Sequence, residues 1–278
     1  MTPLLPCRPA RIGMAVALLT LLVGQRALAL PFAVDVRSYV EGRDTGPAFR
    51  DPNAALGAPA QETGFGDVTP FNAPFTGAAL VQIGPGGELV VHFDHRIEDD
   101  PRNPFGIDLL VFGNAFFFNP DFTGPVLALD VFAEAGDISV SQTGQAWIPI
   151  PGVSADGLFP TQGYTDSSGP FTDDGRTPAD FTRPVDPALD WLGRSFDEIV
   201  ALYAGAGGGT GIDLAVTGLP WIQLVRISLP SDAPGPVEID AFADVAAPEP
   251  ASVLLSVGLA ALALRRFRLR EARRSARH

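Results

Sequence analysis

The chain has 278 residues, with 19 basic and 32 acidic side chains, no lysine and a formal net charge of −13. Residues 30–247 hold 9 of the basic and 30 of the acidic residues, a net charge of −21, so nucleic acid is excluded as a natural partner because its phosphates would be repelled. The single cysteine, Cys7, lies within the first 29 residues, which excludes disulfides and thiol chemistry from the rest of the chain.

Residues 1–29 have the features of a secretory signal peptide. Arg8 and Arg11 form a basic start, residues 12–23 are apolar, and residues 27–29 form a small-x-small cleavage motif. A membrane-anchoring first helix would need a longer apolar core. We therefore expect cleavage after Ala29 and export of the protein.

Regular structure after the signal peptide is predicted to consist mostly of strands. Alternating apolar and polar residues favour strands, and more apolar runs favour inner strands of a sheet. The alternating segments are residues 33–40, 88–93 and 137–141, the more apolar ones are residues 108–112 and 127–132, and residues 146–149, 221–228 and 237–244 complete the set. Clusters of Gly, Pro, Asn and Asp separate them. This pattern predicts an all-β fold, an antiparallel β-sandwich of jelly-roll type over residues 30–247.

Two segments depart from the strand pattern. Residues 152–194 are polar, rich in Pro, Gly, Asp and Thr, and longer than an ordinary loop. We interpret them as an insertion at one end of the sandwich, not as a second domain. Residues 196–203 predict a short helix, because Ser195 can cap it and two acidic residues stand in its first turn.

Residues 248–278 have three parts. A turn-prone triplet, Pro248-Glu249-Pro250, precedes the uncharged apolar residues 251–264, and seven arginines follow, among them Arg265, Arg266, Arg268 and Arg270. Fourteen helical residues rise about 21 Å, less than the roughly 30 Å hydrocarbon core, and arginine side chains can extend the span by snorkelling. The tail therefore predicts a C-terminal transmembrane helix with its arginine side in the cytoplasm.

This order of triplet, apolar helix and arginine tail resembles the PEP-CTERM sorting signal of Gram-negative bacteria. The resemblance implies that an exosortase recognises Pro248, Glu249 and Pro250, cleaves near them and sends the protein outside. The expected location is a membrane-anchored precursor, followed by the cell surface or the extracellular matrix.

A second resemblance covers most of residues 30–247. The segments that carry it are residues 51–59, 83–93, 106–114, 132–135, 140–141 and 211–215. They look like segments of a group of secreted bacterial surface proteins that often carry the PEP-CTERM tail. The domain of that group is similar to the galactose-binding-like jelly roll of carbohydrate-binding modules, which implies the same fold here. One departure is Gly113, where the group usually has an acidic residue.

The sequence has no catalytic signature that stands out. It lacks a Gly-x-Ser-x-Gly elbow, and strand alternation places His92 and His95 on opposite faces, so they do not form a metal pair. Acidic pairs are numerous, but glycoside hydrolysis needs two carboxylates at a set distance, which a sequence does not show. We therefore expect a non-enzymatic protein.

Calcium is a possible cofactor, because hard cations prefer carboxylates and carbonyls on loops. Related jelly rolls commonly hold a structural calcium between an early loop and the final strand. In this chain Asp51 and Asn53 belong to the early loop and Asp240 to the final strand, so these three are the candidate ligands. Alternatively, Asp51 and Asn53 cap turns and Asp240 faces water.

Exposed aromatic rings would mark a sugar-binding face. Phe117, Tyr164 and Trp191 are the candidates for glycan contact, whereas Trp147 and Trp221 stand within strands and are expected to pack in the core. The sequence thus predicts an exported protein of the cell surface or exopolysaccharide matrix, with an exosortase and the membrane as partners. One alternative is a carbohydrate-binding module for an envelope or matrix polysaccharide, and the third is an envelope hydrolase.

Overall fold

A computed structural model of the chain describes residues 30–121 and 124–245. The predicted signal peptide and the sorting tail lie outside the described residues, so the sorting residues Pro248, Glu249 and Pro250 and the tail arginines are not placed. In the described part, no helix combines the length and the apolar content that are needed to cross a bilayer.

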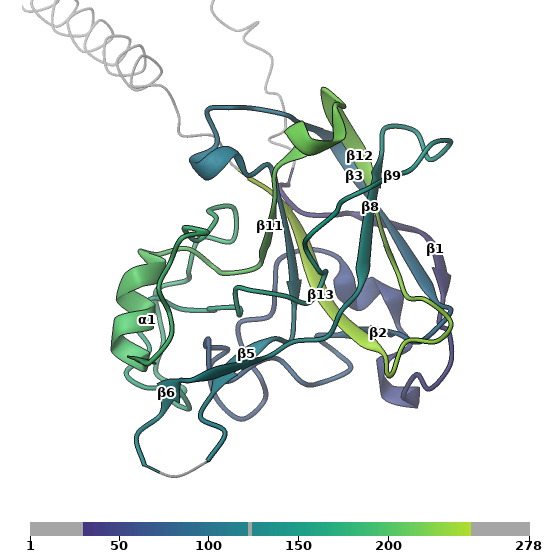
Figure 1. Cartoon of the computed structure of the whole chain (residues 1–278). Coiled ribbons are helices and arrows are strands. Elements are labelled where there is room, and N and C mark those ends of the chain that lie inside the picture. The colour runs from purple at the N-terminus through teal and green to yellow at the C-terminus, as the bar shows by residue number, and fades with distance from the viewer. Residues whose placement is uncertain (1–29, 122–123, 246–278) are drawn as a thin grey trace, which may run out of the picture.

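Two antiparallel sheets form the larger part of the fold (Figure 1). In spatial order the first sheet contains β1 (Asp35–Val40), β3 (Glu88–Glu98), β12 (Trp221–Ser228), β8 (Asp137–Ser141) and β9 (Ile148–Pro149). The second contains β11 (Thr210–Ile212), β4 (Leu109–Gly113), β13 (Val237–Asp244) and β2 (Val81–Ile83). The expected all-β, antiparallel architecture is confirmed. Short 3₁₀ helices interrupt the loops at η1 (Pro47–Phe49), η2 (Pro52–Ala55), η3 (Pro104–Gly106) and η4 (Leu214–Thr217).

The main hydrophobic core lies between these two sheets. Alternate side chains of a strand point to opposite faces, so every second residue of β3 and β8 can face the other sheet. Leu89, Val91 and Phe93 of β3 are fully buried in one cluster with Ile239 and Phe242 of β13. Each such side chain contributes about 1.5–3 kcal/mol when it leaves water, which makes this interface the principal source of stability.

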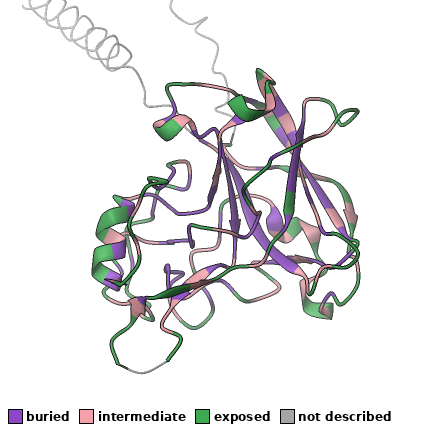
Figure 2. Cartoon of the chain, in the orientation of Figure 1, coloured by how far each residue is buried: buried purple, intermediate pink, exposed green. Residues whose placement is uncertain are grey.

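The four-stranded sheet is covered on its second face as well. Every residue of β4 is buried, and so is every residue of β13 except Asp244 (Figure 2). Phe181, from the long insertion, packs edge-on against Phe112 of β4 with ring centroids 5.8 Å apart. This second cover explains the continuous apolar sequence of β4.

A side lobe lies next to the four-stranded sheet, on the left in Figure 1. We use this name for residues 152–193, helix α1 (Phe196–Tyr203) and the ribbons β5 (Phe116–Phe118) with β7 (Asp130–Phe132) and β6 (Leu127–Ala128) with β10 (Arg194–Ser195). Its own core includes Phe71, Phe117, Phe159, Ile199 and Tyr203. The long insertion therefore supplies part of a second hydrophobic cluster.

The bounds of α1 agree with the sequence prediction. The Ser195 hydroxyl accepts a hydrogen bond from the Glu198 backbone N–H, and the Glu198 carboxylate accepts one from the Ser195 backbone N–H. The prediction of an inner strand over residues 127–132 is wrong. This segment forms two short strands outside both main sheets, and Leu129 and Phe132 are each 40% exposed.

Candidate functional site

A groove of about 600 Å³ crosses the outer face of the five-stranded sheet. Strand β3 explains how it forms, since Leu89, Val91 and Phe93 face the core and the residues between them face outward. The lining residues come from β1, β3, β12 and the β8–β9 turn: Arg37, Ser38, Glu88, Val90, His92, Gln142, Thr143, Gly144, Trp147, Trp221, Gln223 and Leu224.

Two tryptophan–arginine stacks lie at this face. The guanidinium carbon of Arg226 is 4.6 Å from the ring centroid of Trp147, and that of Arg96 is 4.1 Å from the ring centroid of Trp221. Both tryptophans are half-buried and lie outside the hydrophobic clusters. The expectation that Trp147 and Trp221 pack in the core is therefore wrong, because both rings project from the outer face of the sheet.

Local backbone features hold the two rings in place. Pairing of β12 with β3 is irregular between Ile222 and Leu224, and the Gln223 amide spans this irregularity by donating to the Phe93 carbonyl (3.0 Å). At the β8–β9 turn, the Ser141 hydroxyl accepts a hydrogen bond from the Gly144 backbone N–H (2.9 Å). These contacts position Trp221 at the start of β12 and Trp147 just before β9.

The groove also offers polar groups. Arg226 pairs with Glu88 at 3.6 Å, and Arg37 pairs with Asp35 at 3.0 Å. Among the described residues, the buried Nε of Arg226 and the buried Nδ1 of His92 have no hydrogen-bond partner. Burial lowers the pKa of His92, and the charge of Arg37 lowers it further, so the imidazole is neutral at pH 7.

Aromatic rings beside ordered polar groups suit a sugar. The C–H face of a pyranose can pack on an indole ring, while its hydroxyls exchange hydrogen bonds with nearby polar side chains. This site was not predicted from the sequence. One signal was available, because Trp221 lies beside the polar residues that form the outward-facing side of the alternating segment 221–228.

The aromatic residues predicted to contact glycan lie elsewhere. Phe117 is only 1% exposed and stacks on Trp191 at 5.1 Å between centroids, so the prediction that it contacts glycan is wrong, because its ring fills the core of the side lobe. Trp191 is half-buried against the same cluster. Tyr164 donates its hydroxyl to Glu62 at 3.0 Å. None of the three lines the groove.

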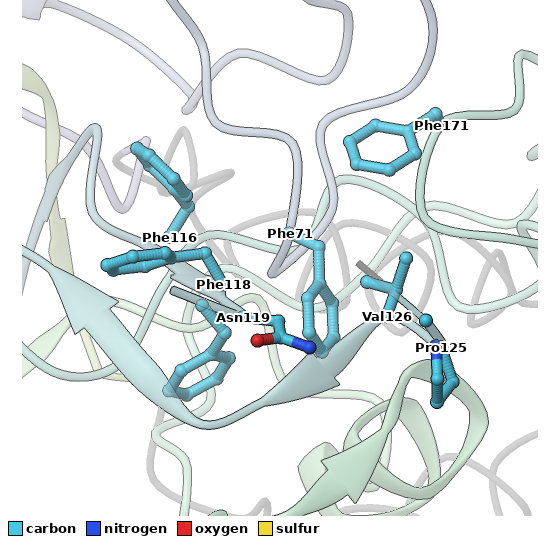
Figure 3. A pocket seen from close by; sticks show the side chains of 9 residues that line it. Phe71, Phe116, Phe118, Asn119, Pro125, Val126 and Phe171 are labelled. Carbon is cyan, nitrogen blue, oxygen red and sulfur yellow. The ribbon is translucent and has the colours of Figure 1, made fainter. Parts of the chain in front are cut away.

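A second pocket, of about 380 Å³, lies at the side lobe (Figure 3). Figure 3 shows Phe71, Phe116, Val126 and Phe171 around it, contributed by separate segments of the chain. Of the described residues that line this pocket, only Asn119 has a polar side chain. Because a sugar needs several polar groups to orient it, the groove with the two tryptophans is the better candidate.

The predicted calcium ligands have partners within the protein. Asp51 is exposed, and its Oδ1 accepts hydrogen bonds from the Asn53 backbone N–H (3.0 Å) and side-chain amide (2.9 Å), which caps η2. Asp240 is 2% exposed and accepts from the Ala60 backbone N–H at 3.0 Å, so it does not face water. Burial raises the pKa of Asp240 to about 8. Calcium bound by Asp51, Asn53 and Asp240 stays a prediction.

A different set of acidic residues lies close together at one end of the four-stranded sheet. Asp99, Asp108 and Asp213 each place an oxygen within 4.8 Å of the others. The buried Asp108 accepts from the backbone N–H groups of Asp100 (3.0 Å) and Leu214 (2.9 Å) and from the Asn103 amide (2.8 Å). Its carboxylate therefore satisfies loop donors.

Comparison with protein-family models, with curated proteins and with solved structures gives no match to this chain. Its function is therefore argued from its own residues.

Proposed function

We propose that the protein is an exported, exosortase-sorted and non-enzymatic protein of the cell surface or extracellular matrix, and that it binds polysaccharide through the groove on the five-stranded sheet. We further propose that the sandwich is a jelly roll of the galactose-binding-like type. The observation that carries the binding proposal is the presence of two tryptophan–arginine stacks on one outer sheet face, with polar side chains between them.

The dimensions of the groove support an oligosaccharide as ligand. Neighbouring strands lie about 4.8 Å apart, so the distance from β1 to β8 across the sheet is about 14 Å. Lining residues come from every strand along this distance or from the turn at its end. A short run of sugar residues could therefore contact Arg37 at one side and Trp147 at the other.

The charges in the groove support binding over hydrolysis. Glycoside hydrolases usually place two carboxyl groups on either side of the scissile bond. Among the lining residues of this groove, Glu88 carries the only carboxylate, and Arg226 neutralises it. An envelope hydrolase is therefore the least favoured of the three functions, after surface display and polysaccharide binding.

A glycan array probed with residues 30–247 tests the proposal. The two main sheets and all three hydrophobic clusters lie between residues 30 and 245, so this segment contains the folded unit. Trp147→Ala and Trp221→Ala should each weaken binding at least tenfold, equivalent to about 1.4 kcal/mol or more, as expected for a central aromatic contact. Trp191→Ala is the matched control outside the groove and should keep the affinity. Unchanged binding after loss of both groove tryptophans would rule out this site.

A further inference from the structure

Three carboxylates lie on neighbouring segments where the four-stranded sheet meets the side lobe. Glu134 lies in the loop between β7 and β8, Asp156 in the long insertion, and Glu238 on β13. The backbone N–H of Ala155 donates to the carbonyl of Gly136 (2.9 Å), which holds the first two segments side by side. Asp156 is 1% exposed and Glu238 is 8% exposed. We call these three residues the carboxylate cluster.

Part of the carboxylate cluster has hydrogen-bond donors and part does not. Asp156 accepts from the backbone N–H groups of Ala115 (2.9 Å) and Glu134 (3.1 Å), and Glu238 Oε1 accepts from the Gln82 amide. In contrast, Oε2 of Glu134 and Oε2 of Glu238 are buried and have no donor among the described residues. These two side chains lie within hydrogen-bonding reach of each other.

No positive charge of the described chain offsets the carboxylate cluster. The arginine ion pairs of residues 30–121 and 124–245 all involve other carboxylates, and none reaches Glu134, Asp156 or Glu238. Two buried carboxylate oxygens without a donor cost several kcal/mol, and a cation between them would remove that cost.

A cavity gives access from solvent to two members of the carboxylate cluster. It measures about 290 Å³, and Glu134 and Asp156 line it together with Ser154 and Thr210. Thr210 is 4% exposed, and its hydroxyl oxygen has no partner in the described part of the chain. The cavity is thus large enough for several waters and has a further unsatisfied polar group in its wall.

We propose that Glu134 and Glu238, with Asp156 beside them and water from the adjoining cavity, bind a divalent cation, and that calcium fits this site best. All the side-chain ligands are hard oxygen atoms, whereas zinc and copper sites use imidazole or thiolate. Calcium accepts six to eight oxygens at about 2.3–2.6 Å in flexible geometry, which suits ligands from three separate segments. The cation would tie β13 to the insertion, and so join the sheet to the side lobe.

Calorimetric titration of CaCl₂ into chelator-treated residues 30–247 tests this site. The wild type should bind calcium and melt at a higher temperature with it than in EDTA, since a ligand that binds only the native state stabilises it by mass action. Glu134→Gln keeps the shape of the side chain and removes one unpaired oxygen charge, and it should weaken calcium binding at least tenfold. Glu238→Gln should have the same effect.

Asp232→Asn provides the matched control, because it removes a carboxylate charge from an exposed aspartate outside both candidate calcium sites and should leave calcium binding intact. In EDTA the Tm of Glu134→Gln should be no lower than that of the wild type. This comparison separates loss of a metal ligand from loss of the fold. Absence of calcium binding to the wild type would overturn the proposal. Equal calcium affinity in the wild type and both Gln variants would overturn it as well. Loss of binding in Asp51→Asn alone would instead assign the metal to the loop at Asp51.

Discussion

The structure leaves no room for a side chain at Gly113. It ends β4 and pairs with Ile239 of β13, so its backbone cannot move away from its neighbours without breaking the sheet. A β-carbon added there would lie 2.3 Å from Oδ1 of Asp156 and 2.8 Å from the carbonyl oxygen of Glu238. Both distances are shorter than van der Waals contact. Gly113→Ala must therefore displace the buried Asp156 carboxylate.

The cost of Gly113→Ala can be worked from these contacts. Overpacking in a rigid interior costs about 1–3 kcal/mol. Displacing Asp156 also leaves the buried backbone N–H group of Ala115 without its acceptor, at about 1–3 kcal/mol. The expected loss is the sum of these two contributions, roughly 2–6 kcal/mol in the free energy of unfolding. For a folded unit of this size, that loss corresponds to a fall in Tm of about 4–24 °C.

Thermal and urea unfolding of residues 30–247 measure this loss. Gly235→Ala is the matched control, because a β-carbon at Gly235 has no heavy atom within 4 Å, and its effect should stay within about 0.5 kcal/mol. In an Asp156→Ala background, Gly113→Ala should cost at least about 1 kcal/mol less than in the wild type, since its main clash is gone. Equal losses for Gly113→Ala and Gly235→Ala would refute the reasoning.

Two further predictions concern sorting and pH. Replacement of Pro248, Glu249 and Pro250 by alanine should leave the full-length protein uncleaved in the membrane fraction, and equal release of mature protein from mutant and wild-type cells would contradict exosortase sorting. The pKa of His92 is lowered in the folded protein, mainly by burial, so folding favours the neutral imidazole. The folded state therefore loses stability as the pH falls below the ordinary value of 6.5, and His92→Gln should flatten the Tm between pH 7 and pH 5. A pH profile of His92→Gln parallel to that of the wild type would contradict this assignment.

Local sequence patterns determined the secondary structure well. The strands over residues 137–141, 221–228 and 237–244 and the helix over residues 196–203 have the predicted bounds. Alternation and helix capping act between residues a few positions apart, so one stretch of sequence contains all the information that they need. The acidic composition is likewise a property of the sequence alone, and the signal peptide and the sorting tail stay predictions.

Burial on the second face of a strand was decided only by the tertiary structure. The alternation of residues 237–244 suggests one outward face, yet Glu238 and Asp240 are both buried, and the Asp240 carboxylate accepts from the Ala60 backbone N–H. Phe117 is buried in the core of the side lobe, whereas Trp147 and Trp221 lie on the free face of the five-stranded sheet. A strand sequence shows that two faces differ, but not what packs on either of them.

Both proposed sites depend on contacts between distant residues. Arg226 stacks on Trp147, and Glu134 meets Glu238, although the members of each pair lie on separate strands or loops. Even the unusual glycine at position 113 is explained only in three dimensions, since the carboxylate of Asp156 fills the space where its side chain would lie. The sequence by itself determined the bounds of three strands and of the helix, because those depend on neighbouring residues. The packing of the two sheets and the side lobe decided which side chains share a groove or a cation site, because only chain folding brings them within a few ångströms of each other.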